Sequence, residues 1–270
     1  MSVERPAQID EIDYSIDSRV IAKAEEILGN PKITPETANK WIHSPVKAAF
    51  ERITFGLIGS LTAPITFGLM AGVQVVDGWP VLDDYDVGYL GLDNEFVGIQ
   101  RLYKVRSLVK NTPKADAQPP HTTSLYKGGR ARYRPDVDSR VHSRYGGLLR
   151  KSSVDELPQL WAILLGTFAG VGGRAYTLSE LKGIKEDFIQ HDLEGNVFPD
   201  NFPTDYRAVV SRVQPKPALF SLYTATLRKA LTMPERLTLD YLYFTKANPL
   251  GDVRIIRATI ENVLQAVGAR

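Results

Sequence analysis

The longest apolar stretch of the chain covers residues 53–76 and contains no charged residue. At about 1.5 Å per residue, a helix of this length is long enough to cross a hydrocarbon layer roughly 30 Å thick. Its polar residues are Thr54, Ser60, Thr62, Thr66 and Gln74. They are too few to form the polar face of a helix in a soluble core. The pattern therefore predicts a membrane helix.

Pro64 lies almost at the centre of this stretch. A proline removes a backbone donor and collides with the preceding turn, so we expect a broken or kinked helix there. Lys40, Lys47 and Arg52 precede the stretch, and a basic segment follows within 25 residues. Positive charge on both flanks favours a re-entrant helix whose two ends lie on the cytoplasmic side. A buried hairpin in a soluble core and a straight crossing helix remain alternatives.

The rest of the pattern predicts an α+β protein that is mainly α. The expected helices cover residues 18–28, 157–168, 178–190, 234–244 and 252–267, with a strand starting at Phe96 and a loop over residues 111–134. We expect a polar N-terminal appendage (1–44), a re-entrant membrane helix region (45–76) and a compact cytosolic domain (77–270). The domain is expected to carry interfacial amphipathic helices and a small β element.

Composition excludes several kinds of site. With 43% hydrophobic and 24% charged residues, the chain can bury a sizeable core. It has no cysteine, which excludes disulfides, thiolate metal sites and cysteine nucleophiles. The acidic N-terminus lacks a basic region followed by an apolar run, so we expect no secretory signal there.

Charge is segregated along the chain. Residues 77–100 hold six acidic residues and no basic one, whereas residues 101–151 hold thirteen basic residues against three acidic ones. Such a basic excess attracts phosphates of nucleotides, nucleic acid or lipid headgroups, or forms a solvated surface. Four tyrosines are interleaved with the basic residues, but no nucleic-acid motif accompanies them, so we expect no nucleic-acid partner.

The sharpest local feature is the pair Asp155–Glu156, which follows Arg150–Lys151 and precedes an apolar helix marked by Pro158. One interpretation is structural, because Ser153 and Glu156 have the spacing of a capping box. The other is chemical. A carboxylate there can hold a divalent cation against a diphosphate or attack phosphorus itself, with nearby cations offsetting the phosphoryl charge.

Residues 150–174, RKSSVDELPQLWAILLGTFAGVGGR, resemble the signature of the bacterial sugar transferase family, the small monotopic phosphoglycosyl transferases. Further similar segments follow the family's order: the apolar run with Pro64, residues 103–108 (YKVRSL), residues 138–141 with Gly146, and a C-terminal set with Arg236, Asp240, Tyr241, Tyr243, residues 252–255 and Thr259. The resemblance covers residues 45–267 and indicates a divergent polyprenyl-phosphate sugar-1-phosphate transferase.

The resemblance implies a two-step transfer. Asp155 attacks the sugar-bearing phosphorus of a nucleoside diphosphate sugar, expected to be a UDP-sugar, and a nucleoside monophosphate leaves. Polyprenol phosphate then takes the phospho-sugar from Asp155. Glu156 assists Mg²⁺ binding or proton transfer, so the expected cofactor is Mg²⁺ and its ligands are Asp155 and Glu156. The expected phosphate-binding residues are Lys104, Arg106, Arg150 and Arg174.

The same resemblance implies a place at the cytoplasmic face of the inner membrane, at the start of cell-surface exopolysaccharide synthesis. The implied partners are the nucleoside diphosphate sugar, polyprenol phosphate, membrane lipids and downstream glycosyltransferases. A catalytically degenerate relative that serves as a membrane scaffold or binds a polyprenyl substrate is the alternative.

The chain departs from the family pattern at several positions. Asp86 replaces an arginine, Gly173 and Ala175 replace prolines, Ala218 replaces a glycine, and Ala63 replaces a serine. These departures bear on donor specificity and on the level of activity. They leave Asp155, Glu156 and Arg150 in place.

Overall fold

The computed structural model describes residues 16–29, 32–107, 146, 149, 154–194, 198–199, 201–226 and 231–268. The expected loop over residues 111–134, the phosphate-binding candidate Arg150 and the capping residue Ser153 lie outside these ranges.

The chain begins with two short helices, α1 (Ser18–Leu28) and α2 (Pro35–Ile42). Asp17 caps α1 by accepting from the backbone of Arg19, and Thr34 caps α2. Six residues of this region belong to the main hydrophobic core: Ile16, Val20, Ala24, Ile27, Leu28 and Ala38. The described part of residues 1–44 is therefore packed into the domain, although its sequence is mostly polar.

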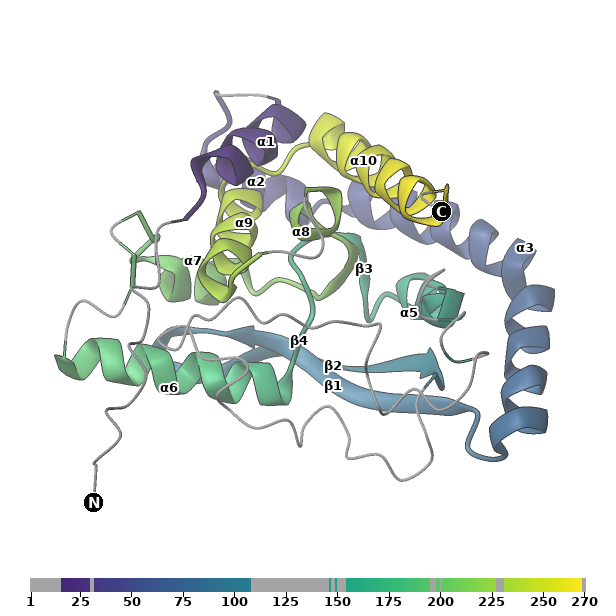
Figure 1. Ribbon diagram of the computed structural model, residues 1–270. Coiled ribbons are helices and arrows are strands. Elements are labelled where there is room, and N and C mark those ends of the chain that lie inside the picture. Colours follow the sequence, from purple (N-terminus) through teal and green to yellow (C-terminus); the bar gives the residue numbers. More distant parts are fainter. Residues whose placement is uncertain are drawn as a thin grey trace, which may run out of the picture.

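Helix α3 (Pro45–Asp77) contains the apolar stretch and continues through Pro64. The helix turns along its course (Figure 1), so the proline bends it without ending it. Two hydroxyls close to the proline bond back to backbone carbonyls, Ser60 to Gly56 at 2.9 Å and Thr62 to Ile58 at 2.8 Å. Such bonds favour bending of a helix.

Both ends of α3 pack against the rest of the protein, and Phe55 and Gly59 lie against α5, while the large apolar side chains between Leu57 and Phe67 are exposed. Near the N-terminal end Lys47 and Glu51 are buried, and near the C-terminal end Val73 packs with Val81 and Val105. Of an apolar 18-residue window in this helix, 22% is buried, and Leu61 is 79% exposed. A helix in a soluble core would be mostly buried, so the alternative of a buried hairpin does not hold. By length and composition α3 can cross a membrane.

The described β structure is small. Strand β1 (Leu82–Leu90) pairs antiparallel with β2 (Phe96–Val105) across a short 3₁₀ turn (Leu92–Asn94), and β4 (Tyr176–Thr177) adds to the other edge of β1. Strands β3 (Ala169–Val171) and β5 (Ala218–Phe220) form a separate parallel pair. The sequence prediction placed β2 correctly but missed β1.

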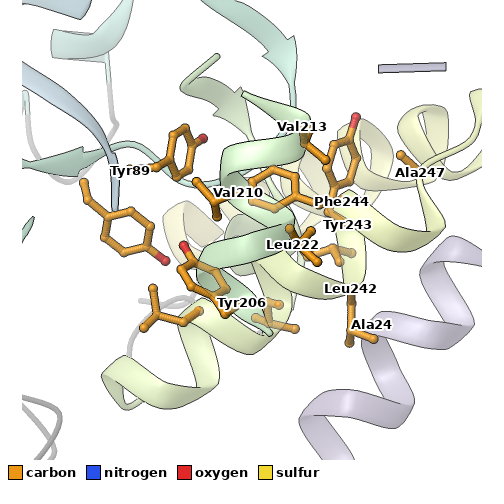
Figure 2. Close-up of a cluster of buried hydrophobic side chains, with 14 of the residues drawn as sticks. Ala24, Tyr89, Tyr206, Val210, Val213, Leu222, Leu242, Tyr243, Phe244 and Ala247 are labelled. Atoms are coloured by element: carbon orange, nitrogen blue, oxygen red, sulfur yellow. The ribbon is translucent and has the colours of Figure 1, made fainter. Parts of the chain in front are cut away.

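Helices make up most of the remaining structure, in agreement with the expected mainly α class. They are α5 (Gln159–Leu165), α6 (Leu178–Glu194), α7 (Tyr206–Val213), α8 (Leu222–Ala225), α9 (Met233–Lys246) and α10 (Pro249–Gly268). The four helices predicted after residue 150 are confirmed as α5, α6, α9 and α10, with shifted ends. Figure 2 shows the core between them, where side chains from α1, β1, α7, α8 and α9 gather.

Candidate active site

The end of β2 supplies two of the predicted phosphate-binding residues. Side chains on a strand alternate between its faces, so Lys104 and Arg106 point to the same side as the buried Leu102. Leu102 packs with Leu160 of α5 in a small hydrophobic cluster. This face of the strand therefore directs Lys104 toward the segment that precedes α5.

That segment is a 3₁₀ turn, Val154–Glu156, and it carries both predicted catalytic carboxylates. Asp155 is buried, with 7% of its surface exposed, and Glu156 is half-buried. The ammonium of Lys104 donates to Oε1 of Glu156 at 2.8 Å. The structure thus brings Lys104 next to the adjacent pair Asp155 and Glu156, which follows it by about 50 residues in the sequence.

Electrostatics tie Asp155 to the same group. Burial alone would lower the pKa of Lys104, but the negative charges of Glu156 and Asp155 outweigh it and hold this pKa above its ordinary value. Tyr85 of β1 lies against the pair, with the Lys104 ammonium 5.6 Å from its ring centroid. Burial raises the pKa of Tyr85, so its hydroxyl stays protonated at neutral pH. Sequence reasoning missed Tyr85, although its place opposite Leu102 in the ladder follows once the register is known.

Arg106 joins this region to the membrane-helix candidate. Its guanidinium is buried and donates to the carbonyl of Gly78, the C-cap of α3, at 2.7 Å. Because the C-terminal end of a helix carries partial negative charge, a cation is stabilised there. Arg106 consequently fixes the end of α3 next to the strand that presents Lys104.

The departure at Asp86 falls on the other face of the sheet. Asp86 stands directly opposite Arg101 in the β1–β2 ladder, and the two side chains are 3.1 Å apart. Arg101 also lies 3.7 Å from Asp84. The outward face therefore pairs one cation with two carboxylates. Because position 86 lies on this face, having aspartate there instead of arginine takes no cation from the side that carries Lys104.

Arg174 makes a different set of contacts. Its guanidinium lies 3.1 Å from Glu180 and 4.5 Å from the ring centroid of Tyr223. Arg236 approaches the same two residues, at 3.9 Å from Glu180 and 5.1 Å from the ring centroid of Tyr223. The two arginines give this second cluster an excess of positive charge. Arg174 stays a predicted phosphate-binding residue.

The buried carboxylate of Asp240 holds the backbone of Arg174 in place. The backbone amide of Arg174 donates to Asp240 at 2.8 Å, and the hydroxyl of Tyr176 donates to the other oxygen at 2.7 Å. Asp240 is 1% exposed, and this burial raises its pKa to about 7. No motif in the sequence indicates a carboxyl group that titrates near neutral pH here.

The departure at Gly173 has a packing reason. A Cβ atom at this position would lie 2.6 Å from Phe244 and 2.8 Å from the hydroxyl of Tyr89. The two aromatic rings therefore occupy the space that a proline side chain would need.

Metal-binding groups are few in the described part of the chain, where no three His, Asp or Glu residues gather. Mg²⁺ in enzymes that handle phosphates is commonly held by one or two carboxylates, water and the substrate itself. Asp155 and Glu156 are adjacent oxygen donors at one turn, and they fit this mode of binding.

The described geometry has a carboxylate pair, a cation from β2 and the end of a helix long and apolar enough to enter a membrane. These are the features expected of a membrane-associated transferase that acts on phosphorylated substrates. Comparison with known proteins gives the family. The sequence profile of the bacterial sugar transferases matches residues 42–266, and the chain belongs to this family.

Two curated relatives are similar over most of the chain. A UDP-galactose-lipid carrier transferase of Erwinia amylovora is 28% identical over 230 residues, which cover 82% of this chain and 42% of the relative. A galactosyl transferase, CpsE, of Streptococcus agalactiae is 26% identical over 224 residues, covering 82% of this chain and 43% of the relative. The chain thus spans less than half the length of either relative.

Proposed function

We propose that this protein is a membrane-bound phosphoglycosyl transferase that moves a sugar-1-phosphate from a nucleoside diphosphate sugar to polyprenol phosphate. Its product would start the assembly of a cell-surface glycan. The observation that carries the proposal is the grouping of Asp155, Glu156 and Lys104 at the turn before α5.

The first step needs a carboxylate nucleophile beside positive charge. One oxygen of Asp155 attacks the sugar-bearing phosphorus, and the bond to the bridging oxygen breaks, so that the nucleoside monophosphate leaves with that electron pair. Lys104 offsets charge on the phosphoryl oxygens as it builds up. When bound at Asp155 and Glu156, Mg²⁺ would supply additional charge neutralisation for the diphosphate.

The second step regenerates the enzyme. A phosphate oxygen of polyprenol phosphate attacks the phosphorus of the Asp155-linked sugar phosphate, and the bond between phosphorus and the carboxylate oxygen breaks. The product is polyprenol diphospho-sugar, and Asp155 returns to its ionised form. Arg106, Arg150 and Arg174 are the remaining candidates for contacts with the phosphates of the two substrates.

The membrane arrangement follows from α3. Its two ends are packed on the rest of the protein and its large apolar side chains between Leu57 and Phe67 are exposed, which favours a helix that enters the bilayer and returns to the same side. We propose that this side is the cytoplasmic face of the inner membrane, where nucleotide sugars are available. The isoprenoid acceptor stays in the bilayer with its phosphate at the surface, within reach of a site at headgroup depth.

A donor screen tests the function. The purified protein in detergent, with Mg²⁺ and polyprenol phosphate, is incubated with a panel of nucleoside diphosphate sugars, and release of nucleoside monophosphate is measured. UDP-galactose comes first in the panel, because the names of both relatives refer to galactose or its transfer. Release with at least one donor supports the enzyme. If no donor of a broad panel gives release, the protein is a scaffold or a polyprenyl-binding relative.

A further inference from the structure

A cavity of about 180 Å³ lies away from the turn that carries Asp155. It is enclosed by the start of α3, the C-terminal end of α5 and the loop before β5, and its lining includes Lys47, Glu51, Arg52, Gly166 and Lys216. Helix α5 separates the two places, since the turn with Asp155 precedes this helix and Gly166 ends it.

Two of the charged residues in the lining belong to a buried ion-pair group of one cation and two carboxylates. Lys47 forms buried ion pairs with Glu51 and with Asp252 of α10. Glu51 also accepts hydrogen bonds from the backbone amides of Gly170 and Val171, at 3.0 and 2.9 Å. This group is fully engaged in holding α3, α10 and β3 together.

Arg52 and Lys216 have no such carboxylate partners among the described residues. Both are exposed, and neither makes an ion pair with an acidic side chain in the described part of the chain. They converge on one residue, Gly166. Lys216 donates to its carbonyl at 2.6 Å, and the guanidinium of Arg52 occupies the space that a Cβ would take. The mouth of the cavity therefore carries two adjacent positive charges.

Capping of α5 explains only part of this arrangement. Cations are stabilised at the C-terminal end of a helix, and Gly166 is the left-handed C-cap of α5. The bond to Gly166 uses one of the three ammonium donors of Lys216. Among the described residues, the five guanidinium donors of Arg52 have no hydrogen-bond acceptor. Most donor groups at the mouth are available for an anion.

The position of the cations points to a particular kind of anion. Arg52 comes directly before the uncharged residues 53–76, and Ile53 is 63% exposed. Leu165, directly before Gly166, is 76% exposed. Exposed apolar side chains thus adjoin both cations, at the boundary between the apolar surface of α3 and the polar domain. Basic residues at this boundary lie at the depth of lipid headgroups.

We propose that this cavity binds the headgroup of an acidic phospholipid, with Arg52 and Lys216 contacting its phosphate and the acyl chains covering Ile53 and Leu165. The bound lipid would be a structural lipid that fixes the start of α3 and the end of α5 at one depth. The inference rests on the proposed insertion of α3 into a membrane and does not depend on the transfer chemistry at Asp155.

Thermal unfolding in detergent tests the site without any measurement of transfer. The purified protein is titrated with dioctanoyl-phosphatidylglycerol, with dioctanoyl-phosphatidylcholine and with inorganic phosphate, and the rise in Tm gives an apparent Kd for each. The variant Arg52→Gln/Lys216→Gln removes both charges. Lys182→Gln/Lys185→Gln is the matched control, because it removes two charges from α6, on the far side of the molecule from α3 (Figure 1).

The expected result is a clear rise in Tm with phosphatidylglycerol and a much smaller one with the other two compounds. The Arg52→Gln/Lys216→Gln variant should bind phosphatidylglycerol roughly thirtyfold more weakly, at about fivefold per basic residue, and the α6 control should bind as the wild type does. Arg52→Lys/Lys216→Arg, which keeps both charges, should retain the affinity within a few fold.

Three outcomes would overturn the proposal. One is an equal response of the wild type and the double glutamine variant, and another is an equal response to phosphatidylcholine. The third is an equal response to inorganic phosphate, which would identify a general anion site. Should the double variant not fold, equal affinities of the wild type and both single glutamine variants would count against the proposal in the same way.

Discussion

The ammonium of Lys104 lies 2.8 Å from Oε1 of Glu156 and joins the end of β2 to the turn before α5. The negative charges of Glu156 and Asp155 outweigh the burial of Lys104 and hold its pKa above the ordinary value, so Lys104 stays protonated beside the buried Asp155. The arrangement stores positive charge next to the proposed nucleophile before any substrate arrives. Lys104 can also change its hydrogen-bond partner, since a substrate phosphate can replace Glu156 as the acceptor.

Replacing Asp155 by Asn should lower sugar-phosphate transfer by a factor of roughly 10³ or more, because an amide cannot act as the proposed nucleophile. Release of nucleoside monophosphate from the active donor is the measurement. Asp86→Asn, on the outward face of β1, is the control and should retain activity within about twofold. Appreciable turnover by the Asp155→Asn protein would exclude Asp155 as nucleophile.

Replacing Lys104 by Gln should lower kcat/KM by about 10²-fold, the scale associated with loss of one preorganised charge at a reacting centre. Lys104→Arg should recover part of the activity, since it restores the charge with a different geometry. Arg101→Gln removes the same charge from the opposite face of the same strand, so it serves as the control. Equal losses of activity in the Lys104 and Arg101 variants would show that the total charge of β2, and not the position of Lys104, supports the reaction.

Replacing Asp240 by Asn should change how stability depends on pH. The pKa of Asp240 is raised to about 7 in the folded protein, against about 3.9 in an unfolded chain. The folded state therefore keeps a proton that the unfolded state has lost, and the contribution of Asp240 to stability falls as pH rises from about 4 to about 7. The Asn variant lacks this loss. Its Tm relative to the wild type should increase across that window, and parallel Tm curves would contradict the assignment.

Replacing Pro64 by Leu should straighten α3, because it supplies the backbone donor that the Ser60 carbonyl lacks. A straight helix would place the N-terminal region on the periplasmic side in those molecules in which α1 and α2 detach from α9 and α10. The chain has no cysteine, so Ser18→Cys on α1 gives a single site for a membrane-impermeant maleimide. Labelling in intact cells should rise for Pro64→Leu but not for Leu61→Ala, an exposed position on the same helix. Unchanged labelling would weigh against the re-entrant arrangement.

Patterns within single elements were readable from the sequence. The uncharged run predicted α3, and the spacing of apolar residues predicted the helices that became α5, α6, α9 and α10. The adjacent acidic pair also stands out in the sequence, whereas Lys104 and Arg106 were predicted through the resemblance to the family. The apolar run, the helical spacing and the acidic pair depend on neighbours along the chain, so local physical chemistry is sufficient to find them.

Contacts between distant segments were not readable. Strand β1 was missed because aspartate is uncommon in strands and β1 holds three, two of which, Asp84 and Asp86, pair with Arg101 of β2. The burial of Ala24, Leu28 and Ala38 depends on α9 and α10, which lie some 200 residues later. The raised pKa of Asp240 likewise follows from burial by distant parts of the chain, and no sequence motif indicates it.

The fastening of α3 at both of its ends has a kinetic consequence under the proposed function. A catalytic turn held at one height above the bilayer would meet its isoprenoid acceptor by lateral diffusion within a plane. The rate would then follow the number of acceptor molecules per unit of membrane area. Diluting the membranes in buffer would leave the second step unaffected, whereas adding inert lipid to each vesicle would slow it.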